Sequence, residues 1–123
     1  MRYDIKKQIK SFGYAWKGIR SCIGKEQNLS FHLIATAVVT VAGSVFGISR
    51  QEWIILILCI TAVISAELFN TAMERLGDSG SPQYHPLAGQ VKDIAAGAVL
   101  VCALGAALAG CLIFYPYLTR MFL

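Results

Sequence analysis

A short polar pattern interrupts an otherwise apolar stretch of the chain. Glu67, Asn70 and Glu74 occupy positions i, i+3 and i+7, which places their side chains on one face of a helix. Together with Asp78 and Asp93, these glutamates make four of the seven acidic residues. Carboxylates are costly inside a bilayer, so those that interrupt an apolar helix usually mark a functional site.

This set of side chains suits phosphoryl transfer to a lipid alcohol. One carboxylate can accept the hydroxyl proton as a general base. Others can hold magnesium, which usually bridges protein carboxylates and substrate phosphates. Lysine side chains and helix N-terminal amides can bind the phosphate charge. On the residues alone, two alternatives stay open: a small proton- or cation-coupled transporter, and a non-catalytic helical assembly in which Glu67 is only a polar packing group.

Three long apolar blocks must position this face. The chain has 123 residues, 56% of them hydrophobic, and a mean hydropathy of +0.59, which is too apolar for an ordinary soluble domain. The blocks cover about residues 29–48, 53–73 and 94–114, close to the roughly 20 residues that cross a bilayer. The first contains no acidic or basic side chain except His32, near its start. We therefore expect one all-α integral membrane domain with three transmembrane helices.

The first 25 residues predict a further helix and an orientation. Apolar residues recur at steps of four and three over positions 3–23, with basic residues between them, which is typical of a helix at a membrane surface. Seven of the eleven basic residues precede the first apolar block. The positive-inside rule then predicts a cytoplasmic N-terminus, a cytoplasmic loop after the second block and an external C-terminus. Because the membrane surface accounts for the basic residues, no nucleic-acid partner is expected.

Small side chains are spaced for helix packing. Gly43 and Gly47 form a small-x-x-x-small pair in the first block. The third block contains two similar pairs, Gly105 with Ala109 and Ala106 with Gly110. Three helices alone offer little interior in which to bury Glu67 and its neighbours, so we expect a homo-oligomer. The four cysteines form no CxxC pair and are expected to behave as small hydrophobic residues.

Several spaced motifs resemble the bacterial diacylglycerol kinase/undecaprenol kinase family over nearly the whole chain. They are Tyr14-Ala-Trp16-Lys-Gly, Glu67-x-x-Asn70-Thr-Ala-x-Glu74-x-x-x-Asp78, Tyr84-His85-Pro-Leu-Ala and Lys92-Asp93-x-Ala-Ala-Gly-Ala-Val. The resemblance implies a surface helix plus three transmembrane helices, assembled as a homotrimer with active sites shared between subunits. It also implies an ATP- and magnesium-dependent lipid kinase of the bacterial cytoplasmic (inner) membrane. The family has no Walker loop, and none is present here.

The resemblance also implies roles for individual residues. Glu67 would be the general base, Glu26 and Glu74 would bind magnesium, and Asn70 and Asp78 would support the site. The residues implied to contact ATP are Lys7, Tyr14, Glu26, Glu74, Tyr84, His85, Lys92 and Asp93. Those implied to border the lipid substrate are Trp16, Arg20 and Asn28. Without the resemblance, Glu26 reads either as a solvated linker charge or as a salt-bridge partner of Lys25 or Arg20.

Two departures from the family pattern stand near the site. Gln83 replaces the usual glutamate before Tyr84, and Arg75-Leu-Gly77 replaces small or β-branched residues after Glu74. Arg75 can pair with a carboxylate or a phosphate, and Gly77 can loosen the end of the helix. Other motifs resemble the undecaprenol kinase branch more than the diacylglycerol kinase branch. Undecaprenol is therefore the favoured substrate, with diacylglycerol as the alternative.

Overall fold

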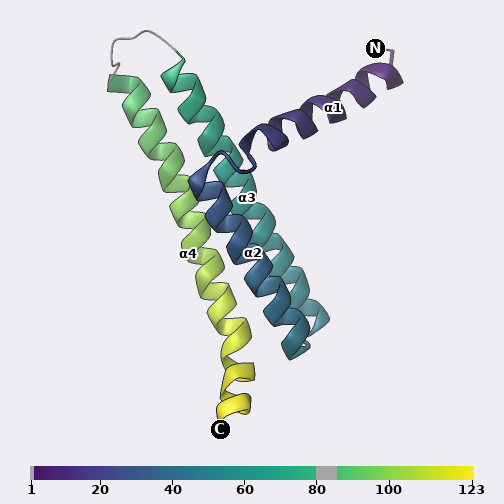
Figure 1. Ribbon diagram of the computed structural model, residues 1–123, viewed down its shortest axis with the longest axis vertical. Coiled ribbons are helices and arrows are strands. Elements are labelled where there is room, and N and C mark those ends of the chain that lie inside the picture. Colours follow the sequence, from purple (N-terminus) through teal and green to yellow (C-terminus); the bar gives the residue numbers. More distant parts are fainter. Residues whose placement is uncertain (1, 80–85) are drawn as a thin grey trace.

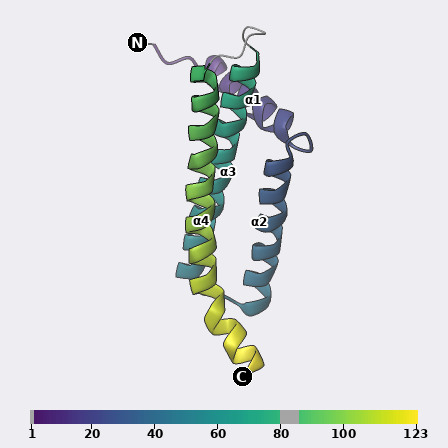
Figure 2. The ribbon, with the colours of Figure 1, turned by 90° about the vertical axis from the view of Figure 1, so that its left-hand side faces the viewer.

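The chain folds into four helices, three of which lie side by side. A computed structural model describes residues 2–79 and 86–123. The helices are α1 (Ile5–Cys22), α2 (Gln27–Phe46), α3 (Arg50–Asp78) and α4 (Pro86–Phe122). Helices α2, α3 and α4 form an elongated bundle, and α1 projects from one end of it (Figures 1 and 2). The all-α class is confirmed, and α2, α3 and α4 are each long and apolar enough to cross a membrane.

Local sequence signals set where the helices begin and end. Asp4 caps α1 by accepting hydrogen bonds from the backbone N–H groups of Lys6 and Lys7. Gly47 ends α2 in the left-handed conformation, with φ of 64°, and its N–H donates to the Gly43 carbonyl. Two residues later, Ser49 and Glu52 form a capping box that starts α3. The connection between α2 and α3 is therefore short and defined by hydrogen bonds.

Two helices extend well past the apolar blocks. α3 continues to Asp78, and α4 begins at Pro86, where proline suits the first helical turn. Helical hydrogen bonding does not require apolar side chains, so the helices continue where the polar residues begin. At 1.5 Å per residue, the 37 residues of α4 span about 55 Å, more than the roughly 30 Å hydrocarbon core. Residues Glu74, Asp78 and Lys92 thus lie on helical extensions rather than on a loop.

The tightest packing lies at the end of the bundle that holds the α2–α3 connection. Ile48, Leu56 and Ile113 form the buried core there, with Trp53 and Tyr117 packed against it. The Tyr117 hydroxyl donates a hydrogen bond to Glu52, which also accepts one from the Ser49 backbone N–H. This contact ties the last turns of α4 to the start of α3.

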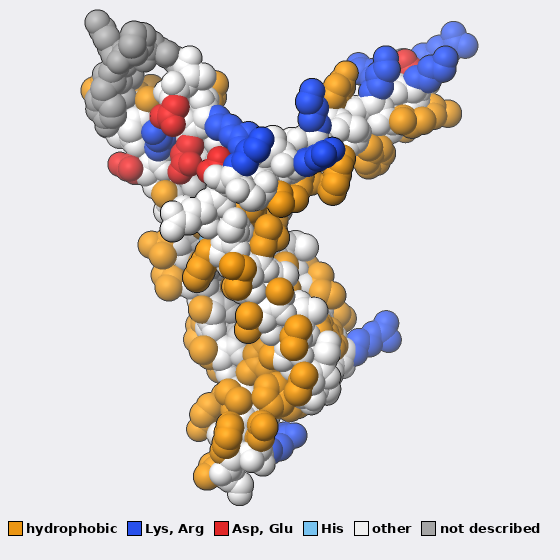
Figure 3. All heavy atoms as spheres, in the orientation of Figure 1, with side chains coloured by type: hydrophobic (Ala, Val, Ile, Leu, Met, Phe, Trp, Pro, Cys, Tyr) orange, Lys and Arg blue, Asp and Glu red, His pale blue; other side chains and the backbone are white. Residues whose placement is uncertain are grey.

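Most large apolar side chains are exposed on the outside of the bundle. Figure 3 shows hydrophobic side chains over most of the visible bundle face, whereas most charged side chains gather near the end where α1 joins. Along α1, basic side chains follow one edge and hydrophobic side chains the other (Figure 3). This distribution is that of a protein whose bundle faces lipid, so the chain is an integral membrane protein.

The small-residue pairs have different structural roles from the one expected. Gly43 is buried, and a Cβ there would lie 2.8 Å from Cη2 of Trp53, so this glycine does permit close packing. Gly47 instead serves as the left-handed cap, and a Cβ at Gly47 or Gly105 would have no neighbour within 4 Å among the described residues. Close packing within one chain is therefore confirmed at Gly43, whereas the pairs in α4 stay a prediction.

Replacing Gly43 with leucine should lower the free energy of unfolding by about 1–3 kcal/mol, because the added side chain must displace the rigid Trp53 ring. The measurement is unfolding in mixed micelles, followed by circular dichroism. The matched control is Gly105→Leu, at an exposed glycine of α4. Equal losses in the two variants would contradict this account of Gly43.

Candidate active site

Three polar side chains are buried together on α3. Glu67, Asn70 and Thr71 are each only 2% exposed. Within the described part of the chain, Oε2 of Glu67, Oδ1 of Asn70 and Oγ1 of Thr71 have no hydrogen-bond partner. A buried polar atom without a partner is destabilising, so such atoms usually await a ligand, water or another subunit. The predicted face of Glu67, Asn70 and Glu74 thus includes two of the three buried polar side chains found in residues 2–79 and 86–123.

His32 of α2 faces the buried glutamate. Its Nε2 lies 4.0 Å from Oε2 of Glu67, too far for a hydrogen bond but close enough for a strong charge interaction if the imidazole is protonated. From the sequence alone, His32 had no predicted role in the site. Its position as the one titratable side chain in the first apolar block was the available signal.

An apolar groove of about 550 Å³ runs between α2, α3 and α4, and His32 lines it. The walls are mostly aliphatic and aromatic, among them Phe31, Leu56, Ile60 and Phe114. His32 therefore lies between an apolar space and the Glu67 carboxylate. The sequence did not predict this groove, because its walls come from three separate helices.

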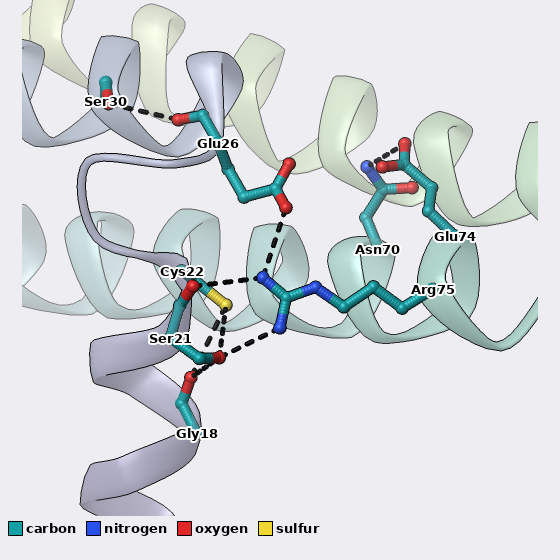
Figure 4. Close-up of polar contacts among 8 residues, drawn as sticks. All are labelled: Gly18, Ser21, Cys22, Glu26, Ser30, Asn70, Glu74 and Arg75. Carbon is teal, nitrogen blue, oxygen red and sulfur yellow. Dashed lines mark hydrogen bonds and ion pairs between the residues drawn. The ribbon is translucent and has the colours of Figure 1, made fainter. Parts of the chain in front are cut away.

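We call Glu67, Asn70 and Thr71 the buried layer. Asn70 connects this layer to the next turn of α3. Its Nδ2 donates a hydrogen bond of 3.2 Å to Oε1 of Glu74 (Figure 4). The Asn70 amide thus fixes one glutamate while its own Oδ1 stays unpaired near the other. The four-residue spacing is what allows this contact along the helix.

Glu26 is brought to α3 by an arginine. Oε1 of Glu26 lies 3.3 Å from Nη2 of Arg75, whose Nη1 also donates to the hydroxyl of Ser21 at 2.9 Å (Figure 4). The sequence-based pairing of Glu26 with Lys25 or Arg20 is therefore wrong, whereas the expected pairing of Arg75 with a carboxylate is confirmed. We call Ser21, Glu26, Asn70, Glu74 and Arg75 the polar cluster.

A second ion pair joins α3 to α4. Nζ of Lys92 lies 2.7 Å from Oδ1 of Asp78, and the Lys92 stem packs over Gly77, where a Cβ would lie 3.3 Å from Cδ of the lysine. Gly77 therefore leaves room for Lys92, and the helix continues through it to Asp78. Asp93 is exposed on the first turns of α4.

Other predicted site residues are exposed within one chain. Asn28 is exposed on the first turn of α2. The four residues predicted on α1 are exposed along a helix that points away from the bundle (Figure 1), namely Lys7, Tyr14, Trp16 and Arg20. Tyr84, His85 and the departure at Gln83 lie outside the described residues.

The donor chemistry fits a magnesium ion that is shared with a phosphate. No group of three His, Cys, Asp or Glu side chains that could hold a metal occurs in residues 2–79 and 86–123. Glu26 and Glu74 belong to two separate hydrogen-bonded groups, Ser21–Glu26–Arg75 and Asn70–Glu74, and each offers one carboxylate. Magnesium commonly takes one or two protein carboxylates, with phosphate oxygens and water completing its shell. The protein alone thus offers a partial site, suited to an ion that arrives with a nucleotide.

Comparisons with known proteins agree with this geometry. The family model for prokaryotic diacylglycerol kinase matches residues 13–114. The chain is 40% identical to undecaprenol kinase of Bacillus subtilis (strain 168) over 117 residues, which cover 95% of each protein. It is 37% identical to a diacylglycerol kinase of Synechocystis sp., covering 92% of this chain and 66% of that protein. It is 28% identical to diacylglycerol kinase of Escherichia coli (strain K12), covering 89% of each.

The match reaches from the first helix to the third membrane span and includes every described residue of the buried layer and the polar cluster. The three relatives described above are all named as lipid kinases, either undecaprenol kinase or diacylglycerol kinase. The chain therefore belongs to the prokaryotic diacylglycerol kinase family and is a lipid kinase.

Proposed function

We propose that this chain is an ATP- and magnesium-dependent kinase that phosphorylates the hydroxyl group of undecaprenol. The single observation that supports the site most directly is the Glu67 carboxylate, which is buried, has an unpaired oxygen and faces His32 at the wall of an apolar groove. A lipid alcohol has the matching chemistry: an apolar chain for the groove and a hydroxyl group for the carboxylate.

In this proposal Glu67 is the general base. Its unpaired Oε2 accepts the proton of the lipid hydroxyl as the hydroxyl oxygen bonds to the γ-phosphorus of ATP and the bond to the ADP oxygen breaks. Burial keeps bulk water from competing as the acceptor of the phosphoryl group. The His32 imidazole lies 4.0 Å from Oε2 of Glu67 and also lines the apolar groove, so it stands beside the place proposed for the lipid hydroxyl.

Glu26 and Glu74 would hold the magnesium ion in the polar cluster. The ion would neutralise phosphate charge as the reaction proceeds. Asn70 keeps Glu74 in place through its side-chain hydrogen bond. Lys92, held by Asp78 at the end of α3, supplies positive charge for phosphate oxygens. We further assign ATP contacts to Lys7, Tyr14, Tyr84, His85 and Asp93, on the family resemblance alone.

The choice of undecaprenol rests on similarity. The identity is 40% to an undecaprenol kinase, 37% to the diacylglycerol kinase of Synechocystis sp. and 28% to that of E. coli, each over most of the chain. Diacylglycerol, whose phosphorylation gives phosphatidic acid, is the second candidate because relatives of that name also match. We place Trp16, Arg20 and Asn28 beside the lipid substrate at the membrane surface.

The proposal includes an orientation and an assembly. α1 lies on the cytoplasmic surface of the bacterial inner membrane, where its basic residues meet anionic lipid. Helix α1, the C-terminal end of α3 and the N-terminal end of α4 then share the side on which ATP is found (Figures 1 and 3). A homotrimer would bring α1 residues of one subunit to the site of another and cover buried polar atoms that one chain leaves unpaired.

Phosphate transfer from labelled ATP to undecaprenol and to diacylglycerol should be measured side by side in mixed micelles. We expect faster transfer to undecaprenol, and a loss of about 10²- to 10⁴-fold in Glu67→Gln, because the amide cannot accept the proton. Unchanged unfolding and micellar size would show that the variant is folded. Near-normal turnover in Glu67→Gln would remove this residue from the role of base, and transfer to neither lipid would point to another lipid alcohol as the substrate.

Glu26→Gln and Glu74→Gln should each raise the magnesium concentration that gives half-maximal activity by roughly tenfold or more, because an amide is a weaker ligand than a carboxylate. The measurement is a magnesium titration at saturating ATP and lipid. Glu52→Gln serves as the control, since it removes a carboxylate from the opposite end of α3. A normal magnesium response in either site variant would show that its carboxylate does not bind the ion.

A further inference from the structure

We propose that Arg75 is a positioning residue that holds the Glu26 carboxylate in the place where magnesium is bound. This inference rests on the proposed function, because it concerns a residue assigned there to the metal. It adds a side chain that departs from the family pattern and that the mechanism above does not use.

Arg75 joins three parts of the chain that are distant in sequence. From α3, its Nη1 donates to the Ser21 hydroxyl at 2.9 Å, and its Nη2 donates to the Ser21 carbonyl at 3.1 Å and to Oε1 of Glu26 at 3.3 Å. Ser21 belongs to the last turn of α1, and Glu26 immediately precedes α2. Figure 4 shows the guanidinium group between them. One planar side chain thus fixes the connector between α1 and α2 against α3.

The two bonds to Ser21 keep Arg75 in place independently of Glu26. The serine contacts involve a hydroxyl and a backbone carbonyl, neither of which changes charge or binds magnesium strongly. If Glu26 turns toward an ion, the guanidinium group keeps two of its three contacts. Lysine has a single ammonium group, which cannot reproduce this planar arrangement of donors.

Glu26 needs such a contact because its own position does not fix its side chain. It is the residue before α2, yet its side chain makes no capping hydrogen bond. It follows Gly24, which has a φ of 76°, in a connector of four residues. Arg75 engages Oε1, so Oε2 remains available to an ion.

The contact orients Glu26 more than it neutralises it. The side chains are 47% exposed for Arg75 and 30% for Glu26, and ion pairs this accessible to solvent contribute little free energy. Ordering a connector before the ligand arrives, however, removes an entropic penalty from binding. Loss of Arg75 should therefore weaken the binding of the metal rather than strengthen it.

The first test measures the connector directly and needs no kinase activity. Hydrogen–deuterium exchange of the amides at positions 23–26 should become severalfold faster in Arg75→Ala, and less so in Ser21→Ala, which removes one of the three bonds. The matched control is Arg50→Ala, an exposed arginine at the other end of the same helix. Unchanged exchange in Arg75→Ala would overturn the anchoring of the connector.

The second test is a double-mutant cycle on metal affinity. Manganese, observed by electron paramagnetic resonance with a non-hydrolysable ATP analogue, should bind severalfold more weakly to Arg75→Ala, with partial recovery in Arg75→Lys. In a Glu26→Gln background, Arg75→Ala should cause no further loss, since Arg75 acts through Glu26. An equal loss in both backgrounds would mean that Arg75 contacts the nucleotide itself, and tighter binding would mean that it competes with the metal. Either result overturns the proposal.

The two levels of hypothesis fail in different ways. Wild-type protein that transfers phosphate to neither lipid would refute the proposed function, whatever the exchange data show. Active wild-type protein whose Arg75→Ala variant keeps normal exchange and normal manganese affinity would refute the positioning role alone.

Discussion

The structure depends on a polar layer that one chain buries without fully pairing it. Glu67, Asn70 and Thr71 each leave an oxygen atom unpaired among the described residues. Apolar burial elsewhere must offset this penalty, and the helix that carries the layer must be held firmly so that the layer does not turn outward. The same unpaired atoms are the ones best able to meet a substrate. The unpaired oxygen atoms therefore lower the stability of the fold and, for the same reason, are free to bind a substrate.

The two ends of the bundle are held together by different kinds of contact. At the α2–α3 connection, apolar side chains pack closely, Gly43 receives the Trp53 ring, and Tyr117 bonds to Glu52. At the other end, the contacts between segments are ion pairs with partly exposed side chains, Glu26 with Arg75 and Asp78 with Lys92. Exposed ion pairs can rearrange at little cost, whereas a packed core has one favoured arrangement. A fixed end thus supports an adjustable one.

The sequence alone predicted the helices and the polar face of α3 well, because both depend on local periodicity. Apolar blocks marked the three membrane helices, and the spacing of Glu67, Asn70 and Glu74 placed them on one face. Contacts between distant segments were less predictable. Arg75 had several carboxylates within reach of a flexible side chain, and only the three-dimensional arrangement selects Glu26. Gly47 fitted a packing motif but serves as a cap, since a glycine pattern does not reveal the sign of φ. His32 gained its significance only when α2 was placed beside Glu67.

The short connection between α2 and α3 has a consequence for how the protein enters the membrane during synthesis. Gly47 and the capping box of Ser49 and Glu52 close the turn with local hydrogen bonds, so it can form before α4 has been made. In the orientation we propose, this turn must cross the hydrocarbon layer, and its Glu52 carboxylate already accepts a backbone hydrogen bond, which reduces the penalty of that transfer. The two helices can then insert together as a preformed hairpin, and α4 can dock afterwards through Tyr117. The order of biogenesis would thus follow from the length and chemistry of a single turn.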